Sequence, residues 1–134
     1  MSILDLTGVA LDNVFEPTVM KAGEEEKLRI VNMIEGVDKN NAKYIMPFFE
    51  SVNDPYCKEF GDYMPIPHDG MGPKDFNKAK ARIVDFSAAF GVDFSKPIDV
   101  EADVKGKEGY AIVGIGKDKD DQPVNKINKY VKGR

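Results

Sequence analysis

Residues 73–91 of the 134-residue chain read PKDFNKAKARIVDFSAAFG. Apolar side chains recur in this stretch at spacings of three or four residues, which places them on one face of a helix. They are Phe76, Ala79, Ile83, Phe86 and Phe90. Proline is favoured at the first position of a helix, and glycine commonly follows the last. The stretch therefore predicts an amphipathic helix that begins at Pro73, ends at Gly91 and packs its aromatic stripe against a core.

Five strands are predicted around this helix, three before it and two after it. Each is a run of alternating or dense apolar residues bounded by turn-forming residues. The runs cover residues 27–35, 42–52, 56–66 with a break near Gly61, 109–117 and 124–131. In the first run, simple alternation puts Leu28, Ile30 and Ile34 on one face. The chain is therefore expected to be mainly β.

Residues 1–23 lack clear periodicity and predict an irregular N-terminal arm. Val14, Phe15 and Val19 in this arm are expected to pack on the body of the protein. No crossover helix is predicted between the early strands, which argues against a ferredoxin-like fold.

The order of three strands, one helix and two strands is that of an OB-fold, a partly open five-stranded Greek-key barrel. In such a barrel the helix between the third and fourth strands closes one end. A length of 134 residues fits a single domain. We therefore expect one OB-fold domain over residues 1–134, a β-barrel that includes the arm.

The single cysteine, Cys57, excludes an internal disulfide and a multi-cysteine zinc site, and it suits a reducing compartment. No apolar run approaches the ~20 residues of a membrane helix. The first 12 residues carry two acidic and no basic side chains, unlike a secretion signal. The sequence thus predicts a cytoplasmic protein, in the host cytoplasm if it is viral, with no membrane contact.

Catalytic and metal-binding groups are sparse. The one histidine, His68, follows Cys57 by eleven residues in a loop rich in proline and glycine, where a solvated side chain is the more common role. The acidic loop with Asp118, Asp120 and Asp121 lacks the glycine and the closing glutamate of a calcium loop. We expect no catalytic residue, metal or cofactor; a metal-dependent nuclease using this loop is the alternative.

The charge is unevenly distributed along the chain. Residues 1–104 hold 11 basic and 19 acidic side chains, whereas residues 105–134 hold 8 basic and 4 acidic ones. A net charge of −4 argues against a nucleic-acid partner, but a basic segment on its own face can still bind phosphates.

Aromatic rings interleaved with basic side chains make the candidate site. Tyr44 and Phe48 share one face of the second predicted strand, Tyr110 lies on the fourth, and Tyr130 lies on the fifth beside Lys126 and Asn128. A ring that stacks on a base contributes about 1 to 3 kcal/mol whatever the base. The expected phosphate contacts are Arg29, Lys43, Lys105, Lys107, Lys117, Lys119, Lys126 and Lys129. The alternative is that Tyr44 and Phe48 are covered by the N-terminal arm or by a second subunit. Which rings face the groove also depends on the strand register, because a slip of one residue would exchange the two faces.

Several blocks of the chain also resemble a known family. They are AKYIMPFFE at 42–50, EFGDYMPIP at 59–67, AAFG at 88–91, GYAIV at 109–113 and NKINKYV at 125–131. These blocks, spread over most of residues 16–131, are similar to small bacteriophage proteins encoded beside replication and recombination genes and regarded as OB-fold single-stranded DNA-binding proteins. The resemblance implies a role in phage DNA replication or recombination.

One feature departs from that resemblance. Many single-strand binding proteins recruit partners through an acidic C-terminal tail, whereas residues 129–134 read KYVKGR. Recruitment of phage replication proteins would therefore need another acidic stretch, such as Glu24–Glu26 or Asp99–Asp103. The leading hypothesis is a non-catalytic binder of single-stranded DNA with little sequence preference. The alternative is a protein-interaction or oligomerisation module that uses the same barrel face, with a homo-oligomer as one form.

Overall fold

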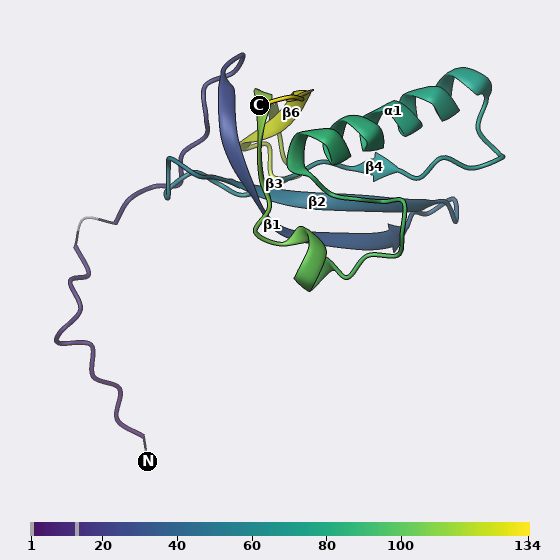
Figure 1. The fold of residues 1–134 in the computed structure, drawn as a ribbon. Coiled ribbons are helices and arrows are strands. Elements are labelled where there is room, and N and C mark those ends of the chain that lie inside the picture. The colour runs from purple at the N-terminus through teal and green to yellow at the C-terminus, as the bar shows by residue number, and fades with distance from the viewer. Residues whose placement is uncertain (1, 13) are drawn as a thin grey trace.

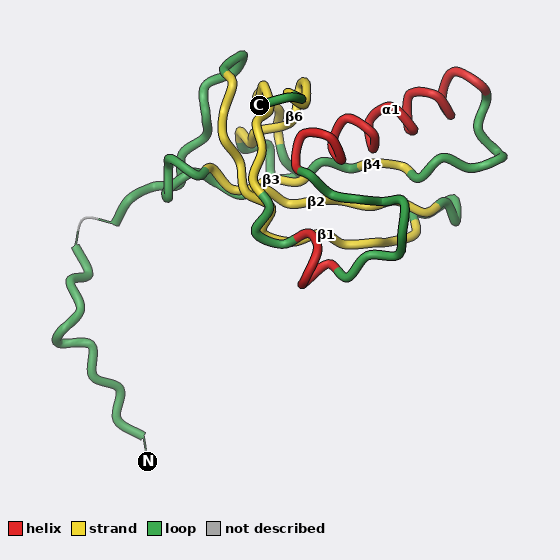
Figure 2. Tube along the Cα trace, in the orientation of Figure 1, coloured by secondary structure: helices red, strands yellow, loops and turns green. Residues whose placement is uncertain are grey.

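The computed structural model describes residues 2–12 and 14–134 (Figure 1). Within these residues the protein is mainly β, with one antiparallel sheet of six strands and one α-helix, whose arrangement Figure 2 shows. The strands are β1 (Glu25–Val37), β2 (Lys43–Ser51), β3 (Phe60–Gly61), β4 (Met64–Pro65), β5 (Glu108–Lys117) and β6 (Pro123–Val131). The α-helix α1 (Pro73–Phe90) lies between β4 and β5, and a five-residue π-helical turn, η1 (Val100–Val104), precedes β5.

Helix α1 has the bounds that the sequence predicts. Pro73 occupies its first turn, and Gly91 ends it in the left-handed conformation, with φ of 69°. Ala79, Phe86 and Phe90 are buried. Phe76 is 37% exposed, so the apolar stripe begins to face the core only after the first turn.

The long strand β1 organises the sheet. Its first part, from Glu25 to Arg29, pairs with β5, and the part from Leu28 to Val37 pairs with β2. The resulting strand order is β3-β2-β1-β5-β6, with β4 also paired to β2. One bent strand therefore holds both halves of the sheet together (Figure 1).

A bulge in β1 reverses the expected orientation of one side chain. Ile30 pairs with Phe49 and Asn32 with Phe48, so one extra residue stands between them. An extra residue shifts the alternation of the strand by one. Met33 is consequently buried and Ile34 is exposed, and the prediction that Ile34 shares a face with Ile30 is wrong.

A second bulge, in β6, has the same effect on Tyr130. Ile112 pairs with Lys129 and Val113 with Ile127, which leaves Asn128 as the extra residue. Ile127 and Tyr130 therefore both face the core, and Tyr130 is only 3% exposed. The expectation that Tyr130 lies on an outer face beside Lys126 is wrong.

The third predicted strand is divided at the expected place. It appears as β3 and β4, which pair with successive parts of β2 and are separated by two residues after Gly61. This division raises the number of strands to six. The sheet is not closed into a barrel, because no strand ladder joins its edges β3 and β6 within the described residues.

Side chains span the gap between those two edges. Arg82 of α1 donates to both Asp62 oxygens, at 3.0 and 2.8 Å, and to the carbonyl oxygen of Ile127 in β6 at 3.0 Å. The Tyr130 hydroxyl donates to Asp62 at 2.5 Å. These bonds connect the β3–β4 segment, the helix and β6.

Aromatic rings fill the core between α1 and the sheet. Phe49 of β2 lies at its centre, with ring centroids 5.2 to 6.4 Å from Phe60, Phe86, Phe90 and Tyr130. Such spacings are those of favourable tilted and edge-to-face pairs. The helix thus covers the inner face of the sheet and leaves the outer face open.

The arm is irregular, as expected, although residues 1 and 13 of this prediction lie outside the described part. Its backbone is attached to the body at two residues. Thr18 forms an isolated β-bridge with Cys57, and the backbone of Met20 exchanges two hydrogen bonds with the Asn125 side chain. Phe15 stacks on Tyr56 at 4.6 Å, but Val14 is 82% exposed and does not pack on the body. In the described residues, none of the helices combines the length and apolar character needed to cross a membrane.

Candidate nucleic-acid interface

The outer face of β2 carries a row of large side chains. Ile45, Pro47 and Phe49 are buried, whereas Tyr44, Met46 and Phe48 alternate with them and stay half-buried on the outside. The face predicted for Tyr44 and Phe48 is therefore correct.

Tyr63 extends this row. Its ring centroid lies 4.8 Å from that of Tyr44, and its side chain is 46% exposed. The Tyr63 hydroxyl donates to Asp38 at 3.3 Å, and burial and this carboxylate raise the pKa of Tyr63. Sequence reasoning missed Tyr63 because it lies in the break between β3 and β4, where alternation gives no orientation.

Two glycines allow the rings to lie close to the backbone. A Cβ atom on Gly36 would stand 2.5 Å from the Tyr44 ring, and one on Gly61 would stand 2.5 Å from Met46 and 2.9 Å from Phe48. The side chains of the row therefore pack directly against the backbone of Gly36 and Gly61, where any larger residue would clash with them.

A hollow of about 360 Å³ adjoins the row at the start of β2. Asn40, Lys43, Ile66 and His68 are among its lining residues. The Nδ1 atom of His68 accepts a hydrogen bond from the Gly70 N–H at 3.0 Å. Lys43 is exposed and makes no salt bridge in the described chain.

Arg29 is held by carboxylates. Its guanidinium lies 2.9 Å from Glu50 and 2.9 Å from Glu108, and Lys27 lies 3.4 Å from Glu108. The hydrogen bonds to Glu50 and Glu108 raise the pKa of Arg29, and the bond from Arg29 lowers the pKa of Glu108. Arg29 is therefore already engaged and does not present a free guanidinium to phosphates.

Tyr110 lies elsewhere on the outer face. It is on β5, opposite Lys27 of β1 and Val131 of β6, and the Arg134 guanidinium covers its ring at 4.5 Å. Arg134 in turn pairs with Glu25 at 2.7 Å. The ion cluster around Arg29 stands between Tyr110 and the row on β2, so the structure does not bring these rings together.

The predicted lysines divide into those that make a salt bridge and those that make none among the described residues. Lys105 pairs with Glu101 at 2.6 Å and Lys117 with Asp121 at 3.4 Å. The others are exposed and have no salt bridge among the residues described: Lys43, Lys107, Lys119, Lys126 and Lys129. Lys126 projects from β6, the strand that faces β3 across the open edge. Lys107 instead lines a small cavity near the end of α1.

The groups considered for catalysis are occupied in other ways. Cys57 is buried with its sulfur 3.7 Å from Asn125, and burial raises the pKa of its thiol. Asp118 accepts backbone bonds from Asp120 and Gln122, and the Gln122 N–H lowers its pKa. Across residues 2–12 and 14–134, no group of three or more His, Cys, Asp and Glu side chains is placed to hold a metal ion.

No protein-family model matches the chain, and no curated protein matches it.

Proposed function

We propose that the protein binds single-stranded DNA without catalysis and with little sequence preference, as part of phage DNA replication or recombination in the host cytoplasm. The observation that carries the proposal is the Tyr44–Tyr63 ring pair on the open outer face of the sheet. Rings in such a position can stack on unpaired bases of any sequence. Phe48 continues the platform along β2.

The topology supports an OB-fold, in which β3 and β4 together count as the third strand. The antiparallel order β3-β2-β1-β5-β6, with the helix between β4 and β5, agrees with that fold. Arg82 and Tyr130 hold the two edge strands together where a barrel would close. In OB-folds the second and third strands and the neighbouring loops bind oligonucleotides. Tyr44, Phe48 and Tyr63 lie on these elements.

Cations at both sides of the row support phosphate binding. Lys43 begins β2 beside Tyr44, and Lys126 projects from β6 beyond β3. Neither is engaged by a carboxylate in the described chain, whereas Arg29, Lys105 and Lys117 are. Because solvent-exposed amines are free to approach a phosphate, we assign the phosphate contacts to Lys43 and Lys126. Lys119 in the β5–β6 loop and Lys129 near the end of β6 add to them.

Fluorescence anisotropy with labelled oligonucleotides tests the proposal. We expect a single strand to bind at least tenfold more tightly than a duplex of equal length, because paired bases hide their faces. The affinity should fall with salt with a log-log slope of roughly −0.7 for each phosphate neutralised. Equal or stronger binding of the duplex would contradict the proposal.

The same assay addresses the nuclease alternative. A labelled single strand incubated with the protein and magnesium or manganese should remain intact. Metal-dependent cleavage that is lost in an Asp118→Asn variant would replace the proposed binding role with an enzymatic one.

A further inference from the structure

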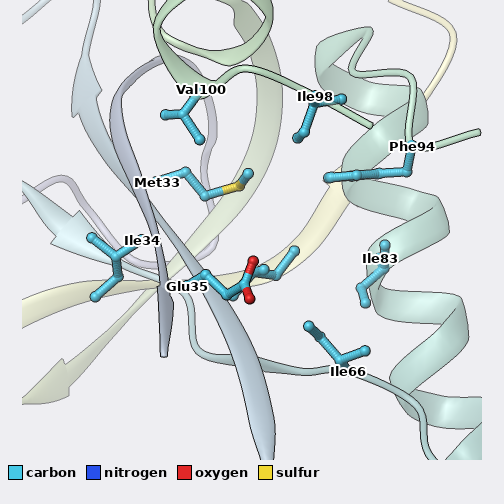
Figure 3. Close-up of a pocket in the computed structure, with 9 residues that line it drawn as sticks. Met33, Ile34, Glu35, Ile66, Ile83, Phe94, Ile98 and Val100 are labelled. Atoms are coloured by element: carbon cyan, nitrogen blue, oxygen red, sulfur yellow. The ribbon is translucent and has the colours of Figure 1, made fainter. Parts of the chain in front are cut away.

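An apolar groove lies on the inner face of the sheet, on the opposite face of β2 from the Tyr44 row. It is bounded by the second half of β1, by α1 and by the segment that follows α1, as Figure 3 shows. Its volume of about 350 Å³ is lined mainly by Met33, Ile45, Ile66, Ile83, Phe94 and Ile98. Such a wall binds apolar groups because their burial removes apolar surface from water.

The arm offers apolar groups that its own chain leaves uncovered. Ile3, Leu4, Leu6, Val9 and Leu11 are between 47% and 88% exposed. A segment that stays solvated is normally poor in such residues. The arm also has local order, since Asp5 accepts a bond from the Thr7 N–H at 2.9 Å. Burial of these apolar side chains against another apolar surface would be favourable.

We propose that residues 3–11 of one copy dock in the apolar groove of a second copy. Reciprocal exchange of the two arms then gives a symmetric dimer, the commonest form of soluble oligomer. The exchange covers the apolar side chains of the arm and the lining of the groove at the same time. It leaves the Tyr44 row open, so the dimer presents two such rows.

The place where the arm is attached favours docking in the groove of a second copy over docking in the groove of the same copy. Thr18 forms hydrogen bonds with Tyr56 and Asp54, which follow the last residue of β2. The groove is instead lined by Ile45, which lies near the first residue of that strand. Residues 2–12 leave the body on the side opposite α1 (Figure 1). An arm that bound its own groove would have to turn back along β2, while an arm from a neighbour has no such constraint.

The oligomeric mass of the full chain tests the exchange, measured by sedimentation equilibrium without DNA. Wild type should be a dimer, and a Leu4→Ser, Leu6→Ser variant should have a dimer dissociation constant at least tenfold higher. Val84→Ser is the matched control, because Val84 is also an exposed apolar residue but lies outside the groove lining. A monomeric wild type, or an arm variant that dimerises as wild type does, would overturn the proposal.

Disulfide trapping separates the second copy from the same copy. In a Cys57→Ser background, one protein carries Leu6→Cys and the other carries Glu35→Cys, which lines the groove. The oxidised mixture should form a covalent heterodimer, and replacement of the second partner by Lys80→Cys on the exposed face of α1 should not. A single chain that carries both Leu6→Cys and Glu35→Cys and forms only an internal link would overturn the exchange.

The proposed exchange of arms does not depend on DNA binding. Because the groove opens on the opposite face of β2 from the Tyr44 row, the Leu4→Ser, Leu6→Ser variant should keep the intrinsic affinity of each subunit for a short oligonucleotide. Loss of dimerisation with retained DNA binding supports the exchange, and retained dimerisation in a protein that binds no DNA contradicts only the proposed function.

Discussion

The hydroxyl of Tyr130 donates a hydrogen bond to Asp62 at 2.5 Å, although the two residues are 68 positions apart in the chain. The bond connects β6 to the segment between β3 and β4, where the strand ladder is interrupted. Arg82 binds the same carboxylate and completes a polar cluster between the sheet edges. This cluster fixes the position of β6 relative to the β3–β4 segment.

Substitution of Tyr130 by Phe should destabilise the protein by about 1.5 to 3 kcal/mol, the contribution of a hydrogen bond to a charged group. Asp62→Ala should cost more, about 3 to 5 kcal/mol, because it leaves the buried parts of Arg82 and Tyr130 without their partner. Urea denaturation of the three proteins checks both values. Equal stability of all three would show that the cluster does not hold the edges together.

The stability conferred by Tyr130 should disappear at alkaline pH. Burial, and next the charge of Asp62, raise the pKa of Tyr130 in the folded protein. Below pH ~10, the ordinary tyrosine pKa, both states keep the proton; above it the unfolded chain releases the proton and the folded chain does not. The free energy of unfolding of wild type should therefore fall by about 1.4 kcal/mol per pH unit relative to Tyr130→Phe. A difference that stays constant up to pH 11 would contradict this mechanism.

Lys43→Gln and Lys126→Gln should each weaken binding of single-stranded DNA and reduce the magnitude of the salt slope by roughly 0.7. Lys80→Gln, which removes the same charge from the exposed face of α1, should leave the slope unchanged. Titrations at several salt concentrations measure the three slopes. If Lys80→Gln reduced the slope as much as the other two substitutions, the phosphate contacts would not be specific to Lys43 and Lys126.

Cys57 should react slowly with thiol reagents in the native protein. Its side chain is buried, and burial raises the pKa of the thiol, so the reactive thiolate is scarce at neutral pH. The reaction followed by absorbance should accelerate in denaturant as the protein unfolds. A Cys57→Ser, Lys80→Cys variant supplies an exposed thiol for comparison, and a native Cys57 that reacts as fast as this thiol would show that the Cys57 side chain is not protected by burial.

Most of the fold could be predicted from local patterns, because each element has its own periodicity and its own breaking residues. The bounds of α1 follow from Pro73 and Gly91, and the face of Tyr44 follows from regular alternation in β2. The orientations of Ile34 and Tyr130 could not be predicted, because a bulge inserts one residue without changing the composition of the strand.

The candidate site was less accessible to sequence reasoning, since it depends on contacts between distant parts of the chain. Arg29 meets Glu50 and Glu108 only through the pairing of β1 with β2 and β5. Tyr63 meets Tyr44 only because β4 folds back on the start of β2. No local spacing indicates either contact.

The most direct test compares the affinity of Tyr44→Ala and Tyr63→Ala for single-stranded DNA with that of Tyr56→Ala. Tyr56 is a matched control because it is exposed to a similar extent as Tyr63 but stacks on Phe15 of the arm, away from the row. Loss of one stacking ring should cost about 1 to 3 kcal/mol, or roughly 5- to 150-fold in affinity. We predict this loss for Tyr44→Ala and Tyr63→Ala and wild-type affinity for Tyr56→Ala. Unchanged affinity in the first two variants, or the same loss in all three, would contradict binding on this face.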